Sequence, residues 1–158
     1  MSVHSPDASI RRMSDADISR VMEIAASSKH APRWPASAYL AAIEPDHAPR
    51  RIALTAFDAE TGALNGFAIA NLVSPDGELE TIAVATEARR RGIGGSLLRA
   101  LVRELRRDLA EQLVLEVRAS NRAAIDFYRS HGFAEIGHRV RYYADPEEDA
   151  ILMRIELD

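Results

Sequence analysis

The chain has 158 residues, of which 47% are hydrophobic and 28% charged, a composition typical of a globular domain. Its net charge of −4 argues against a general nucleic-acid-binding protein, so no nucleic-acid partner is expected. The absence of cysteine excludes disulfides, a thiolate nucleophile and zinc–cysteine sites.

The length predicts one domain over residues 1–158, because it is sufficient to bury a core. The hydropathy of the chain predicts that this domain is cytoplasmic. No apolar run reaches the ~18 residues that a membrane span needs, so we expect no membrane partner. The polar N-terminus, residues 1–8, lacks the apolar core of a signal peptide. The five histidines show no metal-ligand spacing, so no metal site is expected.

The first half of the chain predicts a strand, two helices and three strands. Ser14 or Asp15 caps the first helix, and a loop with two prolines and Trp34 separates the two helices. The short spacing between the three strands predicts antiparallel pairing. These elements are expected over residues 9–13 (strand), 14–28 and 36–43 (helices), and 51–58, 66–73 and 79–85 (strands).

A glycine-rich segment with three arginines, residues 89–95, follows the strand over 79–85 and precedes a helix that runs to about Asp108. A strand–loop–helix unit aims free backbone N–H groups at an anion. Glycines let the backbone approach phosphates closely, and arginines add forked cationic donors. The segment matches neither the Rossmann nor the P-loop spacing. It therefore predicts a site for a phosphorylated cofactor, with an ordinary turn bearing a solvated basic edge as the alternative.

The remaining chain predicts a buried strand, a helix and a closing pair of strands. Asn121 caps the helix, and Gly132 follows its end at His131. An acidic turn, residues 145–149, joins the last two strands. The fold class is therefore α+β, with a mixed, mostly antiparallel sheet and helices on both faces. The elements are expected over residues 113–118 (strand), 121–131 (helix), and 133–143 and 150–157 (strands).

Four segments between Glu78 and Met153, about half of the chain, resemble the GNAT superfamily of N-acetyltransferases. The motif Leu-Glu-Val-Arg-x-Ser-Asn, followed by Ala-Ile-x-x-Tyr and Gly-Phe, is similar to the RimI-type branch, which acetylates the N-terminal alanine of a small-subunit ribosomal protein. The resemblance implies the GNAT fold. The segments are 81–84 (Thr-Ile-Ala-Val), 89–94 (Arg-x-x-Gly-x-Gly), 115–121 (Leu-Glu-Val-Arg-Ala-Ser-Asn) and 124–133 (Ala-Ile-x-Phe-Tyr-x-x-x-Gly-Phe).

The resemblance implies acetyl-CoA as the cofactor, with its pyrophosphate at the glycine-rich segment. Its pantetheine arm would pair with the backbone of the strand before that segment, like an added strand. The Val84 N–H would also polarise the acetyl carbonyl. The implied cofactor-binding residues are Ile82, Ala83, Val84, Arg89, Arg90, Arg91, Gly92, Ile93, Gly94, Gly95 and Asn121.

Glu116 and Tyr128 are the candidate catalytic residues. Glu116 follows three apolar residues in a strand that should be buried on both faces, a setting suited to proton abstraction, although a lone strand glutamate is more often solvated. Tyr128 forms an apolar cluster with Ala124 and Phe127, so core packing is its plain interpretation. The resemblance implies that Glu116 is the general base, directly or through water, and that Tyr128 protonates the leaving thiolate.

The acceptor is expected to be a protein N-terminus, most specifically an N-terminal alanine of a ribosomal protein. An α-amine has a pKa near ~8, so a carboxylate deprotonates it more readily than a lysine amine near ~10.4. The acidic turn could attract a basic tail, or be a solvated tip. Arg141 stands where the family often has asparagine. A small-amine acetyltransferase and a non-catalytic acyl-CoA-binding module remain alternatives. Candidate acceptor-contacting residues are Trp34, Tyr39, Tyr142 and Tyr143.

Overall fold

The computed structural model describes residues 8–157, and within that range seven strands form one sheet. The strands are β1 (Ser9–Arg12), β2 (Arg50–Phe57), β3 (Leu64–Val73), β4 (Asp76–Val84), β5 (Gln112–Arg118), β6 (Ala134–Ala144) and β7 (Glu147–Glu156). Their spatial order is β1-β2-β3-β4-β5-β7-β6, and every neighbouring pair is antiparallel except β4 with β5. The predicted mixed, mostly antiparallel sheet is confirmed.

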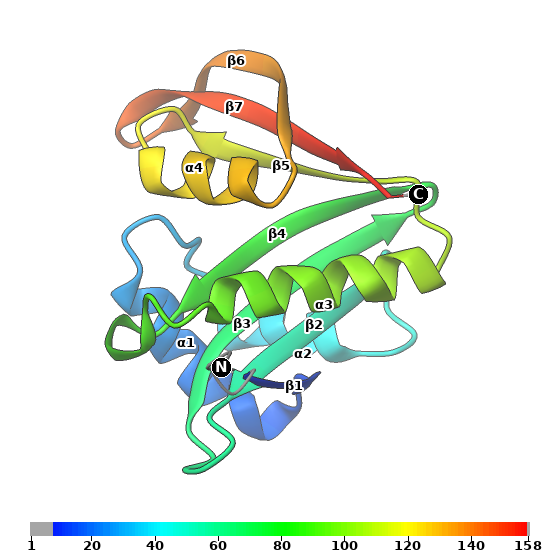
Figure 1. Ribbon diagram of the computed structural model, residues 1–158, viewed down its shortest axis with the longest axis vertical. Helices are drawn as coiled ribbons and strands as arrows, with labels where there is room; N and C mark the ends of the chain where they lie inside the picture. Colours follow the sequence, from blue (N-terminus) through cyan, green and yellow to red (C-terminus); the bar gives the residue numbers. More distant parts are fainter. Residues whose placement is uncertain (1–7, 158) are drawn as a thin grey trace, which may run out of the picture.

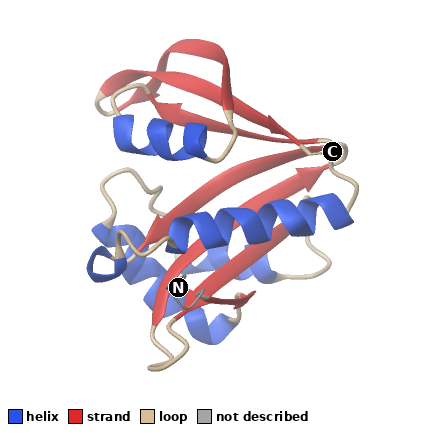
Figure 2. Ribbon diagram, in the orientation of Figure 1, coloured by secondary structure: helices blue, strands red, loops and turns tan. Residues whose placement is uncertain are grey.

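Helices cover both faces of the sheet, as predicted. They are α1 (Ile18–Ser27), α2 (Ala36–Ile43), α3 (Ile93–Arg107) and α4 (Arg122–Ser130), with short 3₁₀ turns at η1 (Asp15–Asp17) and η2 (Thr86–Ala88). In the view of Figure 1, α3 crosses in front of β2 and β3, while α1 and α2 lie behind the sheet. Figure 2 shows the same layers by element type.

The core lies between α3 and the sheet and between the sheet and α1. Leu97, Leu101 and Leu105 recur every fourth residue along α3 and are fully buried, so they form the stripe that packs on the strands. Burying each such side chain contributes roughly 1.5–3 kcal/mol relative to exposure. Truncating Leu101 to alanine would cost about 2–5 kcal/mol, because it would leave a cavity in this layer.

Local signals place most element ends to within about two residues. Asn121 caps α4 by accepting a hydrogen bond from the backbone N–H of Ala124, at 3.2 Å, and Gly132 beyond its end has φ +93°. The predicted first helix is instead divided into η1 and α1. The Asp17 carboxylate accepts hydrogen bonds from both the backbone N–H and the hydroxyl of Ser14, which holds the first turn as a tight 3₁₀ turn.

Two strands begin earlier than their sequences predict. β4 starts at Asp76 and β7 at Glu147, so the acidic turn expected over 145–149 consists only of Asp145 and Pro146. Pairing with β6 extends β7, because Glu147 and Glu148 lie opposite Ala144 and Tyr143 in the register. The acidic residues 147–149 therefore belong to a paired strand.

No helix between residues 8 and 157 is long and apolar enough to cross a membrane. In the same range, no cluster of three or more potential ligand side chains is placed to hold a metal ion. The polar N-terminal segment, whose composition predicts no signal peptide, lies outside the described residues except for Ala8.

Candidate active site

A cleft opens where β4 and β5 separate. The two strands pair only from Asp76–Gln112 to Glu78–Val114, and then diverge (Figure 1). The register between β3 and β4 shifts at this point and leaves Glu80 as an extra residue in β4. A bulge of this kind bends a strand, so it turns β4 away from β5. The resulting cleft has a volume of about 700 Å³ and is lined by both strands.

One edge of β4 faces the cleft with its backbone. Ile82, Ala83 and Val84 pair with β3 on one side and line the cleft on the other. Beyond Glu78, no strand among the described residues pairs with that second edge. An unpaired strand edge presents N–H and C=O groups to an extended, amide-bearing group. The predicted backbone role of these three residues is therefore geometrically available.

The glycine-rich segment forms the end of the cleft and the start of α3. The first intrahelical hydrogen bond runs from the Ser96 N–H to the Gly92 carbonyl, at 3.0 Å. The N–H groups before Ser96 belong to the first turn of the helix, where no intrahelical acceptor exists. Such N–H groups, together with the positive end of the helix dipole, bind phosphates. The cleft-lining residues here are Arg89, Arg90, Gly92, Ile93, Gly94 and Gly95.

The glycines of this segment serve two different purposes. Gly92 has φ +77°, a left-handed conformation that glycine adopts without strain, and a Cβ there would meet nothing within 4 Å. A Cβ on Gly94 would lie 3.4 Å from the Phe127 ring, and one on Gly95 would lie 2.8 Å from His131 Nε2. Gly92 therefore shapes the loop, whereas Gly94 and Gly95 let α4 pack closely against α3.

Arg91 differs from its two neighbours. It is absent from the lining of the cleft, and its guanidinium donates a hydrogen bond to the Glu87 carbonyl at 3.4 Å. Its side chain thus turns back along η2. The structure places Arg89 and Arg90, but not Arg91, against the cleft.

Glu116 lines the cleft from β5. The prediction that this strand is buried on both faces is wrong. Leu115 and Val117 are buried, whereas Glu116 points to the opposite, half-open face with 26% of its side chain exposed. The separation of β4 from β5 leaves this face uncovered. Arg139 Nη1 lies 3.5 Å from Glu116 Oε1. The nearby Glu116 carboxylate raises the pKa of Tyr142.

Tyr128 lines the cleft from α4 and is 8% exposed. Its ring packs against Phe127 and Phe133, with centroid distances of 5.3 and 5.6 Å. Burial raises the pKa of Tyr128 to about 12, so the phenol keeps its proton at neutral pH. Core packing of the ring and proton donation by the hydroxyl are thus compatible.

Asn121 also lines the cleft. Its side-chain oxygen is used to cap α4, as predicted. The amide N–H groups are consequently the side-chain atoms left to contact a ligand.

The four aromatic residues expected at the acceptor side are not brought together. Tyr143 lines the cleft, whereas Tyr142 is exposed on β6. The Tyr142 ring stacks edge-on against the Tyr143 ring, with a centroid distance of 5.1 Å. Trp34 is half-buried and packs on Tyr39 at 5.2 Å. Tyr39 is 1% exposed and also packs on Phe67, so it is a core residue and has no surface to offer an acceptor.

Sequence reasoning missed the charged residues around Glu116. Glu78, Glu80 and Ile82 occupy every second position along β4, and this period of two could have predicted that they share one face of the strand. Burial, followed by the charges of Glu116 and Glu80, raises the pKa of Glu78. Arg51 donates two hydrogen bonds to the Glu80 carboxylate, at 2.9 and 3.1 Å. The half-open face of the cleft is therefore rich in carboxylates, with arginines beside them.

The acidic residues after Pro146 already have partners. Glu148 pairs with Arg118 and with the Ser120 N–H, and Asp149 pairs with His138 at 2.7 Å. Glu147 pairs with Arg141. Two of these three carboxylates face arginines, Arg118 on β5 and Arg141 on β6, which weakens the expectation that this turn attracts a basic tail.

Comparison with known proteins identifies a matching family and similar enzymes. The profile of the acetyltransferase (GNAT) family matches residues 18–133. The chain is 42% identical to the [ribosomal protein bS18]-alanine N-acetyltransferase of Escherichia coli over 100 residues, which are 62% of this chain and 68% of that one. It is 32% identical to the putative enzyme of the same name from Bacillus subtilis, over 96% of this chain and 97% of that one.

Solved structures share the fold. The crystal structure of the ribosomal-protein-S18-alanine N-acetyltransferase from Escherichia coli superposes with a TM-score of 0.81 at 32% identity, covering 95% of this chain and 94% of that one. A putative acetyltransferase from Salmonella typhimurium, solved with its cofactor acetyl-CoA, superposes with a TM-score of 0.80 at 20% identity, covering 96% and 95%. At that identity the second likeness concerns the fold alone.

Proposed function

The chain belongs to the acetyltransferase (GNAT) family, and on that premise we propose that it acetylates the α-amine of a protein N-terminus, an N-terminal alanine of a small-subunit ribosomal protein in particular. The observation that carries this proposal is the divergence of β4 and β5. It brings an open strand edge, a phosphate-binding helix start, Glu116 and Tyr128 to one cleft. The bS18-specific names of the relatives support the acceptor class.

The cleft fits acetyl-CoA, which would supply the acetyl group as a thioester. The pyrophosphate fits the first-turn N–H groups of α3 with Arg89 and Arg90, because oriented N–H groups and guanidinium groups both favour phosphate. The pantetheine arm carries amides that match the open edge from Ile82 to Val84. The Val84 N–H lies at the end of that edge and is our candidate to polarise the acetyl carbonyl.

We assign proton abstraction to Glu116 and proton donation to Tyr128. Glu116 takes a proton from the acceptor ammonium, directly or through water, which frees the nitrogen lone pair for attack. The carbon–nitrogen bond then forms as the carbon–sulfur bond breaks. Tyr128 gives its phenolic proton to the departing thiolate, and the second proton that the acylated nitrogen loses returns to the Tyr128 phenolate, directly or through water, while Glu116 releases its proton to solvent. Its raised pKa keeps the donor form populated before each turnover.

Two peptides test the acceptor. The first begins Ala-Arg and is rich in arginine, and the second is its N-terminally blocked copy with one internal lysine added. Mass spectrometry after incubation with acetyl-CoA is expected to show acetylation of the first peptide alone. Comparable acetylation of the second, or reaction of a small amine while neither peptide reacts, would contradict the proposal.

A further inference from the structure

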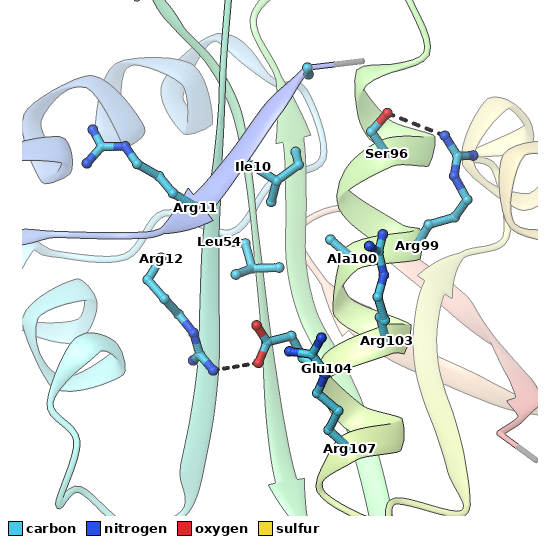
Figure 3. A pocket seen from close by; sticks show the side chains of 11 residues that line it. Ile10, Arg11, Arg12, Leu54, Ser96, Arg99, Ala100, Arg103, Glu104 and Arg107 are labelled. Atoms are coloured by element: carbon cyan, nitrogen blue, oxygen red, sulfur yellow. Dashed lines mark hydrogen bonds and ion pairs between the residues drawn. The ribbon is translucent and has the colours of Figure 1, made fainter. Parts of the chain in front are cut away.

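A second concave surface lies outside the proposed active site, between β1 and the outer side of α3. It is a groove of about 400 Å³, which we call the β1–α3 groove. Its floor is apolar, with Ile10, Leu54 and Ala100 between the strand and the helix (Figure 3). None of its lining residues contributes to the cleft between β4 and β5. A role in acetyl transfer therefore does not explain it.

One wall of the groove is a row of arginines. Arg99, Arg103 and Arg107 recur every fourth residue on α3 and line the groove, and the Arg99 guanidinium turns back to donate a hydrogen bond to the Ser96 hydroxyl at 3.3 Å (Figure 3). No ion pair between residues 8 and 157 involves any of these three side chains. By contrast, Arg12 meets Glu104 at 2.6 Å across the groove, and Glu104 is the one carboxylate that residues 8–157 contribute to its lining. The groove thus keeps a net positive charge on a chain whose overall charge is negative.

On the other side, the floor of the groove ends at β1, the terminal strand of the sheet, whose outer edge is open. Among residues 8–157, β1 pairs only with β2, which lies on its side toward α3. Ile10 and Arg12 alternate toward the groove, while Arg11 points away from it toward Asp17 (Figure 3). The second edge of β1 therefore offers backbone donors and acceptors to a further strand.

We propose that the β1–α3 groove binds an acidic, extended segment of a partner protein, which adds a strand to β1 and places carboxylates against the arginine row. The dimensions agree. The four residues of β1 extend ~13 Å, and Arg99 to Arg107 spans ~12 Å along the helix. Alternate residues of a strand are ~6.6 Å apart, close to the ~6 Å rise between successive arginines. A segment with an acidic residue at every second position would meet all three.

The strand edge favours a peptide over RNA. A peptide backbone supplies both the N–H donors and the C=O acceptors that an open edge requires, whereas a phosphate backbone supplies acceptors alone. A long polyanion would also extend from the groove over a protein of net charge −4. RNA is accordingly the competing outcome of the test.

The test is fluorescence anisotropy with a labelled heptapeptide in which glutamate alternates with threonine. Its controls are the copy with glutamine for each glutamate, and two N-methylated copies, methylated at odd or at even positions. The acidic peptide is expected to bind, more weakly at high salt, and the glutamine copy at least about tenfold more weakly. One N-methylated copy should lose binding and the other keep it, because only alternate N–H groups face β1.

Protein variants locate the site. Arg103→Gln is expected to weaken binding by up to about fivefold, the range of a solvated charge pair. Arg106→Gln, on the same helix but outside the groove lining, is the matched control and should change it less than twofold. The triple variant, in which Arg99, Arg103 and Arg107 are changed to glutamine, should bind the acidic peptide at least about tenfold more weakly while it still binds acetyl-CoA.

The inference is overturned by any of three results. They are binding that survives the triple variant, equal binding of both N-methylated copies, and a short RNA that binds this groove more tightly than the acidic peptide. The proposed acetylation is unaffected by each of them, because its residues lie in the other cleft.

Discussion

Arg139 Nη1 lies 3.5 Å from Glu116 Oε1, so the last hairpin of the chain brings a positive charge to the carboxylate that we assign as the general base. The same guanidinium lies 5.4 Å from the ring centre of Tyr142. An incoming ammonium and Arg139 therefore face one carboxylate. Because 54% of the Arg139 side chain is exposed, solvent screens this ion pair and it is readily exchanged for another partner.

Glu116→Gln should lower kcat by about 10² to 10⁴, the usual contribution of a general base, while acetyl-CoA affinity stays nearly intact. Arg139→Gln, which keeps the carboxylate, should change kcat by no more than about fivefold. Steady-state kinetics and calorimetry measure both variants. Near-normal turnover of Glu116→Gln would remove the assigned role.

Tyr128→Phe should lower kcat by a similar ~10² to 10⁴ without weakening acetyl-CoA binding, because it deletes the proposed proton donor and keeps the packed ring. Single-turnover measurements separate this loss from changes in product release. A variant that turns over at the rate of the parent protein would show that the phenol only packs.

The same variant should change the pH dependence of stability at alkaline pH. The pKa of Tyr128 is raised from 10 to about 12 by burial, so its contribution to stability is complete below pH 10 and is lost as pH rises toward 12. Two pKa units correspond to roughly 3 kcal/mol as an upper value. Urea unfolding at pH 9 and pH 11.5 should show that the free energy of unfolding falls less between these two pH values for Tyr128→Phe than for the parent protein. Equal losses would mean that Tyr128 is not buried as described.

Gly92→Ala should weaken acetyl-CoA binding because alanine resists the left-handed conformation that aims the loop N–H groups. Gly62→Ala is a matched control, since Gly62 also has positive φ, at +73°, with nothing within 4 Å of an added Cβ. Both should lose about 1–2 kcal/mol of stability. Only Gly92→Ala should lose affinity in calorimetry. Equal affinities for the two variants would take the loop out of cofactor binding.

Arg141→Asn should stabilise the protein by a few tenths to about 1 kcal/mol and leave the peptide preference unchanged. Arg141 has φ +56°, a region in which asparagine is better tolerated than arginine. The ion pair that would be lost, with Glu147, is highly exposed and contributes little. Thermal unfolding and the two-peptide assay check this. A changed peptide preference would instead assign the position to acceptor recognition.

The sequence by itself determined the features that depend on neighbouring residues. The bounds of α2, the Asn121 cap and the positive φ of Gly132 follow from side-chain and backbone interactions within about four residues. The strand–loop–helix unit at residues 89–95 was predictable for the same reason.

Only the tertiary structure decided what each side chain meets across the sheet. The bulge at Glu80 and the short β4–β5 pairing left Glu116 half-open rather than buried on both faces. Strand register brought Arg139 to Glu116, and packing against Phe67 took Tyr39 into the core. These contacts join residues far apart in the chain. Their partners depend on pairing register and strand separation, which local propensity does not specify.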